Sequence, residues 1–158
     1  MTSTIDQGVV ILDTQVISWL AKASKHGGPY RQRIAGRRIA MSYWVRTELD
    51  GYEWSSEARK ERLGLLHASS LQLPPSDATS TWFNRVNRKR KEIGLAGRVD
   101  DNDCWIIAQA LEFELPLMTH DAGMARLAFA LGVLVETELP AGDYVAEPAG
   151  GETIAASD

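Results

Sequence analysis

The stretch DDNDCWIIAQALEFELPLMTHD, from Asp100 to Asp121, predicts a helix that leads into a buried strand. Residues 102–113 are apolar at helical spacing, and Asp101 or Asn102 is expected to cap the helix. Residues 116–119 then form a short apolar run that ends just before His120 and Asp121. A helix followed by a strand of this kind is typical of α/β proteins with a parallel sheet.

The rest of the chain continues this alternation. Further strands are expected at residues 9–12, 38–42, 71–73 and 132–137, and further helices at 14–23, from about 30, and at 45–54, 58–67, 78–94 and 123–131. Strands that alternate with helices predict a parallel sheet covered on both faces. Residues 1–140 are expected to form one domain, and the Gly- and Ala-rich residues 141–158 an acidic, flexible tail.

Composition excludes several classes of protein. The 158 residues suit one domain, and no apolar run has the length of about 18 residues typical of a membrane span. The polar start MTSTIDQG does not resemble a signal peptide, so a cytoplasmic protein without membrane contact is expected. The single cysteine, Cys104, lies among apolar residues and is interpreted as a small buried side chain.

Charge is distributed unevenly along the chain. The net charge of −4 equals the charge of residues 141–158, which contain no Lys or Arg. A nucleic acid could therefore be bound only through local basic segments, not through bulk positive charge. Two such segments exist, RQRIAGRR (31–38) and NRVNRKRK (84–91), and the simpler interpretation of each is a solvated helix face.

Four acidic residues stand where a parallel sheet could direct them to one point. Asp13 and Asp121 follow the apolar runs VVIL and PLMTH, whereas Glu48 and Asp103 lie in or at helices. Ligands of such sheets bind at the carboxyl ends of the strands. Carboxylates gathered there repel one another unless a divalent cation holds them together. A site with oxygen ligands and no His or Cys favours Mg²⁺ or Mn²⁺, and such ions promote hydrolysis of phosphate esters.

Each acid also has a simpler structural interpretation. Asp13 and Asp121 could cap helices, Glu48 could be a solvated helical side chain, and one member of the acidic run before Cys104 should cap its helix. Three neighbours are expected to support the acids. Thr14 is expected to cap a helix, Asp101 to substitute for Asp103 as a ligand, and Thr119 to orient a carboxylate.

Three segments together resemble the PIN-domain nucleases, and among them the VapC-type toxins of VapBC toxin–antitoxin pairs. VVILDTQVISWL resembles the family's apolar strand that ends in Asp-Thr, and SYWVRTELDGY resembles its Ser…Glu-Leu-x-Gly segment. The stretch from Asp100 to Asp121 is similar to the family's Asn-Asp-x-x-Ile-Ala…Leu-Pro-Leu-x-Thr-x-Asp pattern, which is the most specific of the three. The resemblance runs from about Val9 to Pro140.

The resemblance implies a three-layer α/β/α fold with a mostly parallel sheet of about five strands. It implies an Mg²⁺- or Mn²⁺-dependent endoribonuclease that cuts tRNA or ribosomal RNA and inhibits translation, with the family's acidic quartet at Asp13, Glu48, Asp103 and Asp121. It further implies a VapB-type antitoxin, a homodimer, and contact with DNA only through the antitoxin. The residues expected to hold RNA are Arg85, Arg88, Lys89 and Arg90.

Two other functions compete with this interpretation. A phosphatase of the haloacid dehalogenase type would require a second Asp two residues after Asp13, where this chain has Gln15. Gln15 also departs from the Asn or Ser usual in PIN domains, which puts a local hydrogen bond in doubt. A PIN-like module whose acids no longer catalyse, and which only binds RNA or a protein, is the second alternative.

Overall fold

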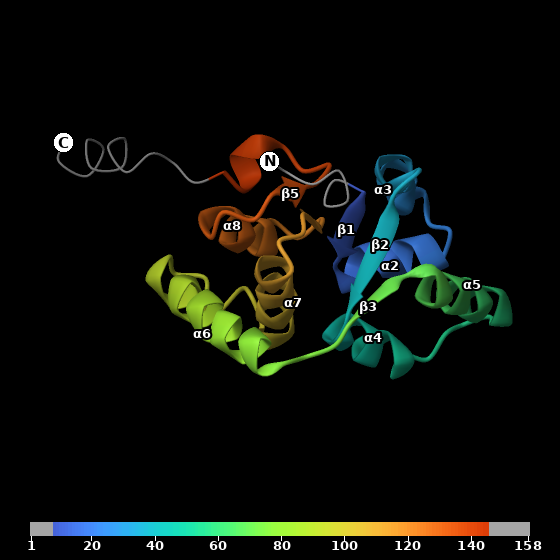
Figure 1. Cartoon of the computed structure of the whole chain (residues 1–158). Coiled ribbons are helices and arrows are strands. Elements are labelled where there is room, and N and C mark those ends of the chain that lie inside the picture. The colour runs from blue at the N-terminus through green and yellow to red at the C-terminus, as the bar shows by residue number, and fades with distance from the viewer. Residues whose placement is uncertain (1–7, 146–158) are drawn as a thin grey trace.

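The computed structural model describes residues 8–145, which form a five-stranded sheet between two groups of helices (Figure 1). All neighbouring strands are parallel, in the order β3-β2-β1-β4-β5. The strands are β1 (Val9–Leu12), β2 (Arg38–Ser42), β3 (Leu71–Leu73), β4 (Leu117–Met118) and β5 (Val135–Glu136). The predicted three-layer α/β/α architecture is confirmed.

The helices divide into two groups by their contacts. On one side α2 (Thr14–Ala21) packs against α3 (Gly28–Ile34) and α5 (Glu57–Ser69). On the other side α6 (Asp77–Glu92), α7 (Asp101–Glu112) and α8 (Ala122–Ala130) pack together. Helix α4 (Tyr43–Asp50) contacts both α2 and α7, so it closes one end of the sheet (Figure 1). Two short 3₁₀ turns complete the described chain, η1 (Lys25–Gly27) and η2 (Ala141–Asp143).

The core is built around β1, which lies between β2 and β4. Val10, Ile11 and Leu12 are completely buried, as expected of an apolar strand that is covered on both faces. Cys104 on α7 is also fully buried, and this burial raises the pKa of its thiol to about 11. The interpretation of Cys104 as a small core residue is therefore confirmed, because a thiol with so high a pKa is a poor nucleophile at neutral pH.

The order of the strands creates a topological switch point beside β1. The chain passes from β1 to β2 and β3 on one side and then returns to place β4 on the other side. Helices on either side of this point leave the carboxyl ends of β1 and β4 open, which is where open α/β sheets bind ligands. Asp13 directly follows β1, and Asp121 follows β4 by three residues.

Several boundaries differ from the predicted ones for identifiable reasons. Helix α4 begins at Tyr43 rather than 45, because Ser42 caps it and accepts a hydrogen bond from the amide of Trp44 (3.3 Å). Strand β5 is confined to two residues, because Gly132 has a φ of +83° and the chain is still turning out of α8 there. The cap of α7 is Asp100, not Asp101 or Asn102.

Regular structure continues past residue 140, the predicted end of the domain. Residues 141–143 form η2, and Tyr144 packs edge-on against Phe129 of α8 with ring centroids 6.1 Å apart. Residues 146–158 lie outside the described residues, so the flexible acidic tail expected there stays a prediction. Between residues 8 and 145, no helix combines the length and the apolar character needed to cross a membrane.

Candidate metal centre

A cavity of about 370 Å³ lies at the carboxyl ends of β1 and β4, and five carboxylates line it. Four are the predicted acids and the fifth is Asp100. Histidine and cysteine are missing from the lining contributed by residues 8–145. The full lining is Asp13, Thr14, Gln15, Ser18, Glu48, Leu49, Tyr52, Asp100, Asp103 and Asp121.

Asp13 is the buried member of the set, with 4% of its surface exposed. Its Oδ1 accepts a hydrogen bond from the amide of Val16 (2.8 Å), so it caps α2. Its Oδ2 accepts a hydrogen bond from the hydroxyl of Thr119 (2.5 Å). Thr119 lies at the end of the adjacent strand β4, so this bond ties the two strand ends together at the floor of the cavity.

Asp103 owes its free carboxylate to its neighbour Asp100. The side chain of Asp100 caps α7 by accepting a hydrogen bond from the amide of Asp103 (2.8 Å). The carboxylate of Asp103 therefore has no capping duty, and it extends from the first turn of α7 into the cavity. The positive end of a helix dipole favours an anion at this position.

Glu48 and Asp121 form the exposed rim of the cavity. Glu48 on α4 accepts a hydrogen bond from the hydroxyl of Thr14 (3.0 Å). Thr14 is thus the first residue of α2 and a partner of Glu48, whereas Asp13 is the cap. Asp121 caps α8 through the amide of Met124 (2.8 Å).

Asp121 is held from its backbone as well. Its amide donates to the hydroxyl oxygen of Thr119 (3.1 Å), so Thr119 contacts both Asp13 and Asp121. Gly123 leaves room for this arrangement. A Cβ at position 123 would lie 3.3 Å from Oδ1 of Asp121 and 3.3 Å from a methyl group of Val99, tighter than ordinary packing.

The acids influence one another electrostatically. Burial raises the pKa of Asp103 to about 7, and the negative charges of Asp100, Asp121, Asp13 and Glu48 add to the increase. Burial likewise raises the pKa of Asp13 to about 6, against the opposing effect of its hydrogen bonds. Groups that disturb one another in this way share one electrostatic environment, so the fold brings the four predicted acids together.

The chemistry of these residues fits a hard divalent cation. Mg²⁺ and Mn²⁺ prefer carboxylate oxygens, and a cation would offset the repulsion among the acids that adds to the effect of burial on both pKa values. Among residues 8–145, however, no three His, Cys, Asp or Glu side chains are already grouped closely enough to hold an ion. The acids therefore offer the right ligands but would need to draw together around the cation.

The other predicted site residues lie further from the cavity. Asp101 faces away from it and pairs with Arg90 (2.9 Å), so Asp100 is the neighbour that supports Asp103. Arg90 is 9% exposed, and its guanidinium also donates to the carbonyl of Val99 (2.8 Å) and to the side chain of Asn87. It therefore joins α6 to the loop before α7, and this structural role leaves little of its guanidinium accessible for the expected contact with RNA.

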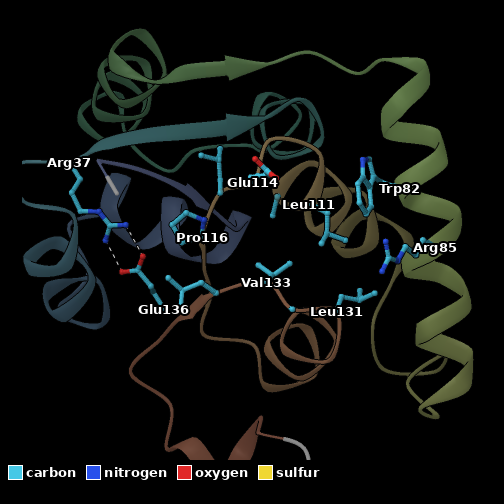
Figure 2. A pocket seen from close by; sticks show the side chains of 13 residues that line it. Arg37, Trp82, Arg85, Leu111, Glu114, Pro116, Leu131, Val133 and Glu136 are labelled. Atoms are coloured by element: carbon cyan, nitrogen blue, oxygen red, sulfur yellow. Dashed lines mark hydrogen bonds and ion pairs between the residues drawn. The ribbon is translucent and has the colours of Figure 1, made fainter. Parts of the chain in front are cut away.

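The remaining basic residues separate in the same way. Arg85 and Arg88 on α6 are exposed, and Lys89 is half-buried and pairs with Glu92 (3.3 Å). In the segment RQRIAGRR, Arg37 forms a two-pronged ion pair with Glu136 of β5 (2.6 and 2.7 Å; Figure 2). Part of each basic segment is thus structural, which the sequence could not separate from a nucleic-acid surface.

Sequence reasoning did not single out three residues near the site. Asp100 appeared only as one of several possible helix caps, and Tyr52 carried no recognisable signal. Tyr30 of α3 is 1% exposed, and its hydroxyl lies 2.5 Å from Nδ1 of His120 and accepts from the amide of Glu138 (3.0 Å). Tyr30 thereby fixes the loops after β4 and β5, although His120 and Glu138 lie 90 and 108 positions after it in the sequence.

Known structures share this fold. The VapBC2 structure from Rickettsia felis, solved with a promoter DNA fragment, matches with a TM-score of 0.67 and 17% identity over 82% of this chain and 98% of that one. VapBC-1 from nontypeable Haemophilus influenzae matches with a TM-score of 0.64 and 21% identity, over 82% of this chain and 97% of that one. VapBC-5 from Mycobacterium tuberculosis matches with a TM-score of 0.55 and 26% identity, again over 82% of this chain and 97% of that one.

Comparison of sequences gives a more direct result. No curated protein matches the chain. The family model described as PIN domain matches residues 10–130, which include β1 through α8 and all five carboxylates of the cavity. The chain therefore belongs to the PIN-domain family.

Proposed function

We propose that the protein is a metal-dependent endoribonuclease that acts as the toxin of a VapBC-type pair. The observation that carries this proposal is the cavity in which five carboxylates, and no histidine or cysteine of the described chain, surround one space at the switch point of the sheet. PIN domains are a nuclease family, and the similar structures come from VapBC complexes.

The residues of the cavity would divide the work. Asp13 and Asp103 would hold the principal Mg²⁺ or Mn²⁺, while Glu48 and Asp121 would complete the ligand set from the rim. When bound, the cation supplies a Lewis acid that neutralises phosphoryl oxygens and lowers the pKa of water. Thr119 keeps Asp13 oriented, and the exposed carboxylates Glu48 and Asp121 are placed to accept a proton during hydrolysis.

Substrate and partners follow from the same proposal. Arg85 and Arg88 on α6 are the exposed cations that would hold the backbone of a structured RNA such as tRNA or ribosomal RNA. A VapB-type antitoxin would bind the protein in the cytoplasm, and any promoter DNA would be contacted through that antitoxin. We also propose a homodimer, in keeping with the family resemblance.

RNA cleavage by charge-neutralised variants tests the proposal. Asp13→Asn and Asp103→Asn should each lower the rate of RNA cleavage in Mn²⁺ by at least about a hundredfold, because each removes a negative ligand of the cation. Asp143→Asn, in the exposed turn η2, is the matched control and should retain full activity. Undiminished cleavage by purified Asp13→Asn and Asp103→Asn proteins would refute the assignment.

The alternative of a catalytically silent binding module makes a different prediction. It would arrest growth on expression, if at all, through binding alone, so Asp13→Asn should not relieve the arrest. The toxin proposal expects relief by Asp13→Asn and none by Asp143→Asn. The retention of all four predicted acids in one cavity favours the active nuclease.

A further inference from the structure

A second cavity adjoins the acidic one, and Leu49 and Tyr52 line both. It measures about 840 Å³ and lies between α4 and α5, within the size range of sites for small organic groups. Tyr52 therefore stands on the boundary between the two cavities. The remainder of its lining includes Arg46, Asp50, Glu53, Trp54, Glu57 and Lys60.

Tyr52 and Trp54 give this second cavity an aromatic wall. Their ring centroids are 5.3 Å apart at an interplanar angle of 65°, and Tyr52 is 53% exposed. The indole of Trp54 donates to the carbonyl of Leu49 (3.3 Å), as does the amide of Tyr52 (3.2 Å). The Trp54 ring and the backbone of Tyr52 are thus anchored to the last turn of α4, the same helix that presents Glu48.

A cation stands beside this wall. The ammonium group of Lys22 lies 5.1 Å from the centroid of the Tyr52 ring and 5.9 Å from that of Trp54. Lys22 caps the C-terminus of α2, whose N-terminus is capped by Asp13. One positive group therefore lies near a boundary that is otherwise strongly acidic, where it can approach a phosphate of the backbone.

The charges of the second cavity suit a neutral ring better than a phosphate. Arg46 and Lys60 are outnumbered by the three carboxylates Asp50, Glu53 and Glu57, and Arg46 already lies 3.7 Å from Asp50. Carboxylates accept hydrogen bonds from the exocyclic amines of bases, and aromatic side chains stack on their faces. The cavity thus offers both of the contacts that an unpaired nucleobase uses.

We propose that this second cavity binds the base of a nucleotide next to the scissile phosphate, with the ring of Tyr52 as its stacking surface. The inference rests on the proposed function, because the acidic cavity must hold that phosphate. It adds a base-binding site to the nuclease and makes an unpaired or extruded nucleotide the preferred place of cleavage.

Substitution of Tyr52 tests the stacking surface. Tyr52→Ala should weaken binding of a labelled random-sequence single-stranded RNA 12-mer in Ca²⁺ by about tenfold, in line with the loss of one base–aromatic stack. It should raise KM for cleavage of that RNA in Mn²⁺ similarly while kcat stays within about threefold of wild type. Tyr52→Phe keeps the ring and should retain wild-type binding.

Two controls separate stacking from general damage. Tyr43→Ala removes an exposed tyrosine at the start of α4, which is 48% exposed and lines neither cavity, and should change neither binding nor KM. An abasic oligonucleotide of the same length should bind wild type and Tyr52→Ala equally, because it has no base to stack. Thermal unfolding of each variant establishes that the fold is retained.

The outcomes distinguish this inference from the function it rests on. If wild type cleaves the RNA but Tyr52→Ala has an unchanged KM, or Tyr52→Phe loses as much affinity as Tyr52→Ala, the base site is wrong and the nuclease stands. If wild type cleaves no RNA in Mn²⁺ or Mg²⁺, the proposed function itself is contradicted.

Discussion

At the scale of single residues, Asp13 uses each of its carboxylate oxygens for a different protein donor. One oxygen caps α2 through Val16, and the other accepts from Thr119 of the neighbouring strand. The capping interpretation and the metal-ligand interpretation are therefore compatible, since a carboxylate oxygen has lone pairs for both a donor and a cation. Asp121 shows the same combination, because it caps α8 and lines the cavity.

Loss of the Thr119 hydroxyl should weaken the metal centre. Thr119→Val removes the hydrogen bond that lowers the pKa of Asp13 and leaves the amide of Asp121 without its acceptor. Affinity for Mn²⁺ should fall by about tenfold, the usual effect of losing a group that orients a ligand. Calorimetric titration measures this, with the exposed Thr81→Val as control. Equal affinity of Thr119→Val and wild type would show that the hydroxyl plays no such part.

Asp103 should make the metal-free protein less stable as the pH rises. Burial raises its pKa to about 7, and that of Asp13 to about 6, above the value near 3.9 expected for Asp in the unfolded chain. Between these values the folded protein binds more protons than the unfolded one, so the free energy of unfolding decreases from about pH 4 to pH 7.

The variant Asp103→Asn tests this linkage because it cannot ionise. In chelator at pH 8 it should be more stable than wild type by on the order of 1 kcal/mol, or a few degrees in Tm. At pH 4 the advantage should disappear, since wild-type Asp103 is then protonated. An advantage that is the same at both pH values would contradict the charge-based explanation.

At the scale of elements, the sequence predicted which segments form helices and strands better than where they end. Apolar periodicity located every strand, because burial on both faces of a parallel sheet leaves runs such as VVIL. The ends depended on contacts that a sequence does not display. Ser42 starts α4 early, and Gly132 delays β5 by adopting a positive φ.

The basic face of α6 illustrates the same limit. Arg85, Arg88 and Arg90 look equivalent in NRVNRKRK, but only Arg90 turns inward to meet Val99 and Asp101. Arg85 and Arg88 are three positions apart and share a face of the helix, whereas Arg90, two positions after Arg88, lies on a different one, and the face that meets the next loop is set by tertiary packing. The sequence could therefore identify a basic segment without showing which cation was structural.

Removing the guanidinium of Arg90 should destabilise the junction of α6 and α7. Arg90→Met keeps the apolar stem but leaves the carbonyl of Val99 and the side chain of Asn87 without their donors. The expected loss is about 2 kcal/mol of unfolding free energy, as for hydrogen bonds to a charged group. Urea unfolding measures it, with the exposed Arg88→Met as control. A loss below about 0.5 kcal/mol, typical of surface sites, would contradict this role.

At the scale of the whole molecule, the strand order gives the acids their common position. Residues 13, 48, 103 and 121 are far apart in sequence and meet because β1 and β4 are neighbours at the switch point. Their type was predictable, as was the place of Asp13 and Asp121 after strands and of Glu48 and Asp103 in or at helices. Other features of the site depended on tertiary packing and were not predictable. Asp100 joins the four acids, Asp101 pairs with Arg90 instead, and Tyr52 lines a second cavity.

Cation binding should stabilise the whole fold, because the cation would offset repulsion among side chains from α4, α7 and the ends of β1 and β4. In wild type, Mn²⁺ at about a hundred times its Kd should add about 2.7 kcal/mol of stability. At the same Mn²⁺ concentration the gain in stability should be smaller at pH 5.5, because Asp103 is then protonated and the proton competes with the cation. Asp13→Asn should gain little stability from Mn²⁺. A rise in Tm as large as that of wild type would show that the cation binds elsewhere.

The most direct test is a crystal of the protein grown with Mn²⁺, in which anomalous scattering locates the ion independently of any assay. We expect a strong anomalous peak between the carboxylates of Asp13 and Asp103, with Glu48 or Asp121 within reach, and its loss in Asp103→Asn crystals. A cavity without the peak at saturating Mn²⁺, or a peak bound to other residues, would contradict the metal centre.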